Sequence, residues 1–267
     1  MIVFPNAKIN IGLNIISKRA DGYHNLETVL YPVKLHDALE VVLSDKMAFT
    51  SSGIFIPGDA ENNLCLKAYH LVNQDFDLPK LKIHLHKNIP IGAGLGGGSA
   101  DCSFFIKLIN NLCGLNLSTK MMHNYARKLG ADCAFFIDNK PVFAFEKGDQ
   151  FEDVALDLSG YHLVLVMPQV HVSTAEAYSG VQPKAPKFDL KSALKLPIEE
   201  WKTQIKNDFE QSVFQHHPEI LSVKEALYKS GALYAAMSGS GASVFGVFSK
   251  KPDLQHLEQA NQVFYNV

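Results

Sequence analysis

Residues 90–101 read PIGAGLGGGSAD and contain five glycines in twelve positions. Each glycine loses more conformational freedom on folding than any other residue, and an ordinary flexible turn needs only one or two of them. An apolar alternating stretch precedes the segment and an apolar-rich stretch follows it, so we expect a strand, the glycine loop and then a helix beginning near Ser99. Backbone N–H groups and the positive end of the helix dipole would then face one concavity, which is typical of a phosphate-binding loop.

Three familiar nucleotide-binding patterns do not fit this loop. A Walker A sequence requires lysine and a hydroxyl residue after its last glycine, but Gly97 is followed by Gly98. The spacing of Gly92, Gly94 and Gly97 matches the dinucleotide fingerprint, yet residues 102–131 contain no Asp or Glu to hold a ribose hydroxyl. The sequence also lacks the HRD and DFG motifs of protein kinases.

The loop itself carries no cation and no base, so other segments must supply them. Lys8 and Asn10 share one face of a predicted strand, an arrangement that also describes an ordinary solvated strand face. Asp132 lies in GADCAFF, directly before an apolar run, where a carboxylate must be paired or hydrogen-bonded. Pairing with a lysine such as Lys8 would keep Asp132 ionised as a general base, and a helix N-cap role fits the pattern equally well. Ser99 fits either an anion or Mg²⁺ ligand or a helix cap.

A second polar motif, RADGYH, places Tyr23 and His24 just after a turn. A tyrosine beside a histidine can stack on a flat ring and bind its polar edge. The same residues also suit a surface turn.

Composition excludes several classes of function. The chain is 47% apolar and 19% charged, which is typical of a globular protein. Its net charge of −2 gives no electrostatic reason to expect a nucleic acid or an anionic membrane as partner. We also find no signal peptide and no apolar run long enough to span a bilayer. The four cysteines form no CxxC pair, so we expect buried free thiols in a reducing cytoplasm. His84 and His86 alternate onto the polar face of a strand, where metal binding is not expected.

Strands and helices alternate irregularly along the chain, which predicts an α+β fold. The composition shifts near residue 152, and we place a boundary there between domains at 1–152 and 153–267. A Pro- and Lys-rich stretch at 181–197 is expected to be a surface excursion. The predicted strands cover 7–16, 26–35, 37–43, 80–87, 140–145, 162–168 and the stretch around the GSG turn, and the predicted helices cover 61–74, 100–114, 118–129, 199–212 and 218–230.

Taken together, the motifs resemble those of the GHMP small-molecule kinase superfamily. AKINIGLNI at 7–15, the glycine loop and MSGSGASVFG at 237–246 occur in the order of that superfamily's three motifs. KRADGYHNLETV, LGADCAFF and VSTAEAY are similar to one branch of it. Members of that branch phosphorylate the 2-hydroxyl of a cytidine-diphosphate-linked alcohol in non-mevalonate isoprenoid precursor synthesis.

The resemblance implies a fold and a role for each matching residue. The fold would pair a ribosomal-protein-S5-like N-terminal domain with a ferredoxin-like C-terminal domain, with the site between them. Asp132 would be the catalytic base and Lys8 its cationic partner. The expected ATP-binding residues are Asn62 and Asn63 for adenine, and Gly92, Gly94, Gly96, Gly97, Gly98 and Ser99 for the phosphates. Tyr23 and Tyr178 would sandwich the cytosine and His24 would bind its edge, while the other expected substrate residues are Asn10, Thr174, Gly239 and Gly241.

The expected cofactors are ATP and Mg²⁺, the metal ligands being unknown, and the expected partner is a small cytidine-diphosphate substrate. We expect a cytoplasmic monomer or weak homodimer with neither a nucleic acid nor a membrane as partner.

Two departures from the branch accompany these expectations. Cys133 and Ala134 follow Asp132 where many members have Val-Pro, and Tyr178 stands where some have Phe. Other functions compatible with the sequence are a mevalonate- or homoserine-type kinase, a nucleotide-dependent oxidoreductase, and a nucleotide-binding module without activity.

Overall fold

The computed structural model describes all residues from Met1 to Val267 and has the predicted α+β character. The chain forms two compact units, both discontinuous in sequence. The first unit consists of Met1–Lys8, Lys34–Ile91 and Gly96–Lys140. The second consists of Ile9–Val33, Gly92–Leu95 and Pro141–Val267. These units therefore interleave along the chain, whereas the predicted boundary near residue 152 divides it into consecutive halves.

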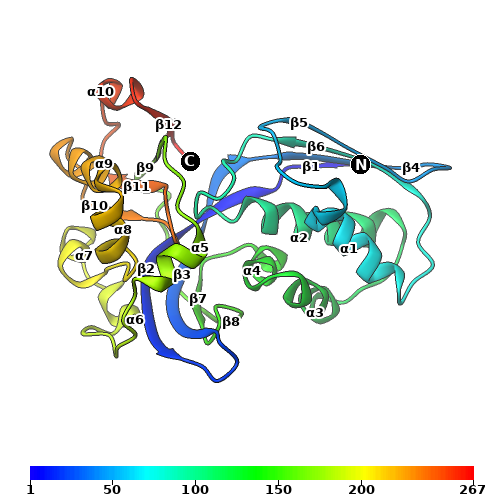
Figure 1. Ribbon diagram of the computed structural model, residues 1–267, viewed down its shortest axis with the longest axis horizontal. Helices are drawn as coiled ribbons and strands as arrows, with labels where there is room; N and C mark the ends of the chain where they lie inside the picture. Colours follow the sequence, from blue (N-terminus) through cyan, green and yellow to red (C-terminus); the bar gives the residue numbers. More distant parts are fainter. The chain divides into compact units, whose positions relative to one another are not determined.

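The first unit is a two-layer structure with helices gathered on one side of a sheet (Figure 1). The sheet order is β1-β4-β6-β5, and only the β5–β6 pair is parallel. Its strands are β1 (Ile2–Val3), β4 (Ala38–Leu43), β5 (Ala48–Gly53) and β6 (Leu81–Lys87). The helical layer comprises the short η1 (Ala60–Asn62), α1 (Leu64–Asn73), α2 (Gly97–Leu112), α3 (Thr119–Leu129) and α4 (Ala131–Asp138).

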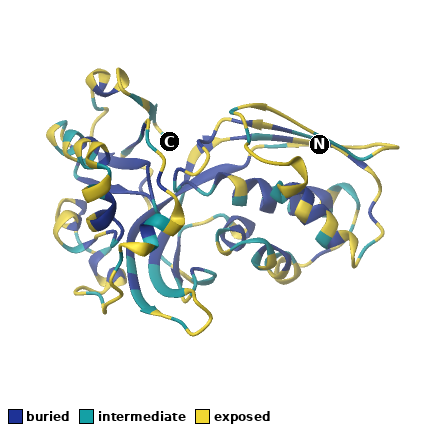
Figure 2. Ribbon diagram, in the orientation of Figure 1, coloured by how far each residue is buried: buried dark blue, intermediate teal, exposed yellow.

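Side-chain alternation explains which face of β6 is buried. Leu81, Ile83 and Leu85 are fully buried, whereas His84 and His86 lie on the more exposed face as predicted (Figure 2). Lys87 follows the same alternation onto the buried side. A lysine at such a position requires a partner, and this one has two.

The second unit is built on the antiparallel sheet β10-β11-β9-β12. Its strands are β9 (His162–Pro168), β10 (Tyr234–Met237), β11 (Val244–Phe248) and β12 (Asn261–Tyr265). Helix α9 (Pro218–Lys229) packs on β9, β10 and β11. The remaining helices are α5 (Thr174–Ser179), α6 (Leu190–Ala193), α7 (Ile198–Gln204), α8 (Glu210–His216) and α10 (Gln255–Glu258).

A third sheet has the order β2-β3-β7-β8. Its strands are β2 (Asn6–Lys18), β3 (His24–His36), β7 (Val142–Phe145) and β8 (Gln150–Asp153). Most of this sheet belongs to the second unit, but Asn6–Lys8 of β2 and Lys34–His36 of β3 belong to the first.

One predicted helix, 199–212, is interrupted in the structure. Helix α7 ends at Gln204, Ile205 is extended, and α8 begins at Glu210. The Asn207 side chain in the gap donates hydrogen bonds to the carbonyl oxygens of Met237 and Gly239. These tertiary bonds override the helical periodicity.

None of the helices combines the length and the apolarity needed to cross a bilayer. All four cysteines are free thiols as predicted, and three of them are buried, whereas Cys113 is half-buried against the prediction.

Candidate active site

The predicted lysine–aspartate pair forms within the first unit. Lys8 Nζ lies 3.3 Å from Asp132 Oδ2. The Lys8 side chain is 4% exposed and that of Asp132 is 38% exposed, so the pair is closed on the lysine side and open on the carboxylate side. The solvated-face interpretation of Lys8 and Asn10 is therefore wrong, because both residues are buried.

Asp132 is the second residue of α4, and Gly130 occupies the N-cap position without any side-chain cap. The alternative that Asp132 caps the helix is therefore wrong. An acid in the first turn of a helix is stabilised as a carboxylate by the helix dipole. The Asp132 carboxylate therefore has two positive neighbours, the N-terminus of α4 and the Lys8 ammonium.

The second half of the glycine loop forms the N-terminus of α2. The helix begins at Gly97, two residues before the predicted start, with Gly96 as N-cap at a φ of 70°. No side chain caps this end and no acid lies in the first turn, so the first backbone N–H groups are available to an anion. Ser99 is the third residue of α2 and not its cap.

Steric limits explain why this end of the loop is glycine. A Cβ on Gly96 would lie 3.1 Å from Lys8 Cε, and its positive φ strains any other residue. A Cβ on Gly97 would lie 2.9 Å from Ile89 and 3.3 Å from Lys87 Nζ. The bare backbone thus lies directly beside the Lys8 side chain, which would place a cation next to bound phosphates.

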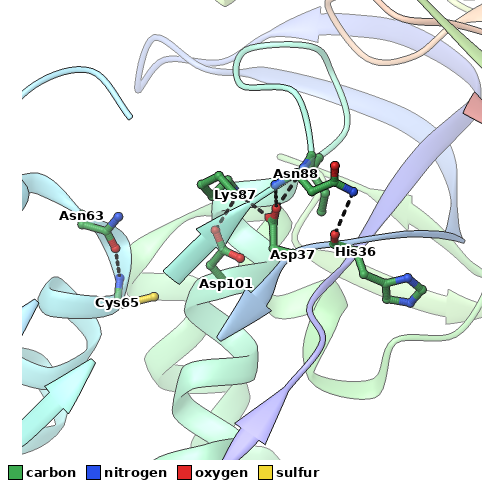
Figure 3. A network of polar contacts seen from close by, with 8 residues as sticks. His36, Asp37, Asn63, Cys65, Lys87, Asn88 and Asp101 are labelled. Atoms are coloured by element: carbon green, nitrogen blue, oxygen red, sulfur yellow. Dashed lines mark hydrogen bonds and ion pairs between the residues drawn. The ribbon is translucent and has the colours of Figure 1, made fainter. Parts of the chain in front are cut away.

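A buried charge cluster adjoins the same loop (Figure 3). Lys87 Nζ donates to Asp101 Oδ2 at 2.7 Å and also to Asp37, and all three side chains are at most 4% exposed. Asp37 Oδ1 also accepts hydrogen bonds from the backbone N–H groups of Asn88 and Ile89, at 2.6 and 2.9 Å. The cluster therefore joins the residues before the glycine loop to the helix after it.

The pKa values in this cluster follow from burial and from the presence of two carboxyl groups around one ammonium group. Burial raises the pKa of Asp101 to about 7, against the opposing attraction of Lys87. Burial alone would lower the pKa of Lys87, but the carboxylates of Asp101 and Asp37 outweigh it and raise that pKa. Asp101 Oδ1 is buried and has no hydrogen-bond partner.

In the second unit, the first half of the glycine loop meets the C-terminal glycine loop. The Ser238 hydroxyl donates to the Gly94 carbonyl at 2.9 Å and accepts from the Asn10 backbone N–H at 3.2 Å. A Cβ on Gly239 would lie 3.2 Å from Asn10 Oδ1, and one on Gly94 would lie 2.0 Å from the Ser238 carbonyl oxygen. Asn10 Nδ2 also donates to Thr28 Oγ1. The structure thus brings Asn10, Gly94 and Gly239 together.

The predicted cytosine-binding aromatics are arranged differently from the expected sandwich. His24 stacks on Tyr178, with ring centroids 4.8 Å apart and an interplanar angle of 24°. Tyr23 is 64% exposed, and the Lys147 ammonium lies 5.4 Å from its ring centroid. Thr174 is the exposed first residue of α5, the helix that also carries Tyr178.

The remaining predicted site residues do not form a group with one another. Asn63 uses its side chain to cap α1, accepting from the Cys65 N–H at 2.9 Å, and Asn62 is exposed in η1. A Cβ on Gly92 would meet the His171 ring, and one on Gly241 would meet Met237 Sδ. Their roles in binding stay predictions.

Comparison with known proteins decides the family. The N-terminal domain of the GHMP kinases matches residues 63–140, and their C-terminal domain matches residues 190–266. The 4-diphosphocytidyl-2-C-methyl-D-erythritol kinase of Parabacteroides distasonis is 56% identical over 250 residues, covering 94% of this chain and 92% of its own. The chain belongs to the GHMP kinases. It is accordingly an ATP-dependent small-molecule kinase.

Further relatives of this GHMP kinase agree with that assignment. The 4-diphosphocytidyl-2-C-methyl-D-erythritol kinase of Bacteroides fragilis is 54% identical, covering 97% of this chain and 96% of its own. A crystal structure of 4-(cytidine 5'-diphospho)-2C-methyl-D-erythritol kinase matches with a TM-score of 0.86 at 27% identity, covering 99% of this chain and 98% of that one. The homoserine kinase of Cytophaga hutchinsonii matches with a TM-score of 0.67 at 18% identity, over 98% of this chain and 94% of its own, and shares the fold.

The residues that support this site were not predicted from the sequence. Lys87 had a visible signal, since strand alternation places it among the buried residues of β6. Asp37, Asp101 and Ser238 had none, because their partners are distant in sequence.

Proposed function

We propose that this GHMP kinase carries out the reaction that names its relatives, transfer of the γ-phosphoryl group of ATP to the 2-hydroxyl of 4-diphosphocytidyl-2-C-methyl-D-erythritol. The observation that carries the proposal is the Lys8–Asp132 pair at 3.3 Å beside the uncapped N-terminus of α2. Phosphoryl transfer requires positioning and electrostatic stabilisation more than covalent chemistry from the protein. A base, a cation and a backbone anion site are the parts that this requires.

The roles of the first unit follow from its geometry. The N–H groups at the start of α2 bind phosphate oxygens, with Gly96, Gly97, Gly98 and Ser99 as the residues of that turn. Asp132 accepts the proton of the attacking hydroxyl as the new P–O bond forms and the bond from the γ-phosphorus to the β–γ bridging oxygen breaks. Lys8 pairs with the Asp132 carboxylate and stabilises the negative charge of the transferring group. Asn62 and Asn63 directly precede α1, where they would contact adenine.

The fit to ATP and Mg²⁺ rests on the donor set. An uncapped helix N-terminus with no acid in its first turn suits phosphate. No group of three or more His, Cys, Asp or Glu side chains is arranged to hold a metal ion. This agrees with a Mg²⁺ ion held mainly by nucleotide phosphates and water, with few protein oxygens. Bound Mg²⁺ would neutralise phosphate charge, and the side-chain oxygens of Ser99 in the first turn of α2 and Asp132 in the first turn of α4 would hold it.

The residues of the second unit would bind the cytidyl part of the substrate. Tyr178 and His24 already form an aromatic stack on which a pyrimidine can pack, and Tyr23 supplies another exposed ring. Asn10, Thr174, Gly239 and Gly241 would contact the rest of the substrate, and Gly92 and Gly94 would continue the phosphate loop. We place the enzyme in the cytoplasm, where ATP is available, and expect it to act as a monomer or weak homodimer.

The deciding experiment measures phosphorylation of 4-diphosphocytidyl-2-C-methyl-D-erythritol by the wild type and by Asp132→Asn. We expect kcat to fall by about 10² to 10⁴, the usual contribution of a general base, while the KM for ATP changes little. Asp138→Asn is the matched control, because it changes another aspartate of α4 that is 43% exposed. Near-wild-type turnover by Asp132→Asn would contradict the base assignment. Wild-type activity on mevalonate or homoserine, with none on the cytidyl substrate, would contradict the proposed substrate.

A further inference from the structure

Helix α4 is too short to fix its own position. It has eight residues, and helices of that length are not stable in isolation, so contacts with other elements hold it in place. Its second residue is Asp132, whose distance from Lys8 is the central geometry of the proposed site. The contacts of α4 therefore decide where the base lies.

Two asparagines connect α4 to the strand that carries Lys8. Asn139 Nδ2 donates to Asn6 Oδ1 at 2.7 Å, and Asn6 Nδ2 donates back to Asn139 Oδ1 at 3.2 Å. Asn6 Nδ2 also donates to the Ala7 carbonyl at 2.9 Å. Because each amide has one donor and one acceptor group, the reciprocal pair fixes the orientation of both side chains.

The positions of these asparagines couple them to the ion pair. Asn6 precedes Lys8 by two residues on β2. Asn139 is the C-cap of α4, with φ of 53° and ψ of 47°, and its backbone N–H closes the helix onto the Phe135 carbonyl. Strand and helix are therefore joined twice, by Lys8–Asp132 at the start of α4 and by Asn6–Asn139 at its end. Two attachments prevent the helix from rotating about either one, whereas a single attachment would allow that rotation.

Helix α4 is also attached to the phosphate-loop helix α2. Lys107 of α2 donates to the carbonyl oxygens of Phe136 and Ile137, at 2.9 and 3.3 Å. The Ser103 hydroxyl, also from α2, donates to the Cys133 carbonyl. These bonds place α4 relative to the phosphates, and the asparagine pair places it relative to the lysine.

We propose that Asn6 and Asn139 are positioning residues for phosphoryl transfer, which hold Asp132 at its working distance from Lys8. The inference rests on the roles proposed above for Lys8 and Asp132. Neither asparagine is expected to touch a substrate. Their loss should therefore lower kcat and leave the KM values for ATP and the cytidyl substrate nearly unchanged.

The test begins with Asn139→Gly. Glycine adopts the left-handed backbone of this position readily, so the substitution removes the amide pair and keeps the helix end. We expect kcat to fall about tenfold, since small displacements of catalytic groups produce losses of this order. Asn116→Gly is the matched control: Asn116 also has a positive φ, of 56°, and lies exposed in the same unit. It should change kcat less than about twofold.

Asn6→Ala and the double variant complete a cycle that separates positioning from general stability. If the pair acts as a unit, Asn6→Ala/Asn139→Gly should have a kcat no lower than the worse single variant. Asn139→Asp, which can still accept from Asn6, should have an intermediate kcat. Thermal unfolding of each variant identifies any that fail to fold, and Asn6→Ala then provides the measurement if Asn139→Gly does.

The outcomes distinguish this inference from the proposed function. Wild-type kcat in both single variants, with Asp132→Asn inactive, would overturn the positioning role and leave the base assignment intact. Losses that multiply in the double variant would overturn it as well, because they indicate independent effects. Near-wild-type turnover by Asp132→Asn would instead overturn the base assignment on which this inference rests.

Discussion

The first unit contains two lysine–aspartate clusters that differ in how they meet solvent. In the Lys8–Asp132 pair the carboxylate is 38% exposed and the ions are 3.3 Å apart. In the Asp37–Lys87–Asp101 cluster every side chain is at most 4% exposed, and the lysine bonds to both carboxylates (Figure 3). Both clusters adjoin the start of α2, since Lys8 packs against Gly96 and Lys87 against Gly97.

Under the proposed function, this difference separates a reactive charge pair from a structural one beside the same helix start. A base must receive a proton from substrate, so its carboxylate needs an open side. A sealed pair cannot do this, but removal of one of its partners leaves a charge that water cannot reach. We therefore expect changes to the open pair to affect rate, and changes to the closed cluster to affect folding.

The largest effect on stability is expected for Lys87→Met. The variant leaves two buried carboxylates without their cation, and breaking a buried pair in this way costs about 3 to 5 kcal/mol. Thermal unfolding should show a decrease in Tm of roughly 6 to 20 °C. Lys191→Met is the matched control, because Lys191 pairs with Glu152 on the surface, where ion pairs contribute little to stability. Equal losses in the two variants would refute the distinction between the clusters.

The two clusters also show which parts of the site could be predicted from the sequence. Lys8 and Asp132 were found because each belongs to a motif resembling a known family, and the glycine loop indicated a phosphate site between them in sequence. The strands β2, β6 and β9 were also predicted, because their residues alternate or run apolar in the way that strands do. A local sequence pattern therefore predicts a feature when a single strand, helix or loop contains all the residues that define it.

Pairings between distant residues were not predictable from such patterns. Asp37, Lys87 and Asp101 come from a strand connection, a strand end and a helix, and only the folded sheet brings them together. The start of α2 at Gly97 was also missed, since glycine is a poor helix former and the tertiary fit of the loop overrides that propensity. The gap between α7 and α8 has the same kind of cause, the bonds of Asn207 to the second glycine loop.

An intermediate effect, dependent on pH, is expected for Asp101→Asn. The pKa of Asp101 is about 7 in the folded chain, because of burial, and about 3.9 in an unfolded one. The folded state holds this proton more tightly, so the contribution of Asp101 to stability is fully present below about pH 4 and is lost as pH rises through 7. Asparagine has no such titration and can still accept from Lys87.

Urea unfolding of the wild type and of Asp101→Asn at pH 5 and pH 8 would measure this contribution. Between these pH values the free energy of unfolding of the wild type should fall relative to that of the variant. Taking the difference removes titrations that the two proteins share. A difference that stays constant between pH 5 and pH 8 would show that Asp101 remains ionised throughout.

The smallest effect on stability is expected for Asp132→Asn, the same variant that should lose most activity. Its carboxylate is partly solvated, and ion pairs open to water contribute about 1 kcal/mol or less. Asp37→Asn makes the same chemical change at a carboxylate that is 0% exposed and accepts two backbone hydrogen bonds besides that of Lys87. It should therefore destabilise the chain more than Asp132→Asn does, because an amide nitrogen would replace one of the acceptors that these buried donors require. If the two substitutions lowered Tm equally, exposure of the carboxylate would not be what separates the reactive pair from the structural one.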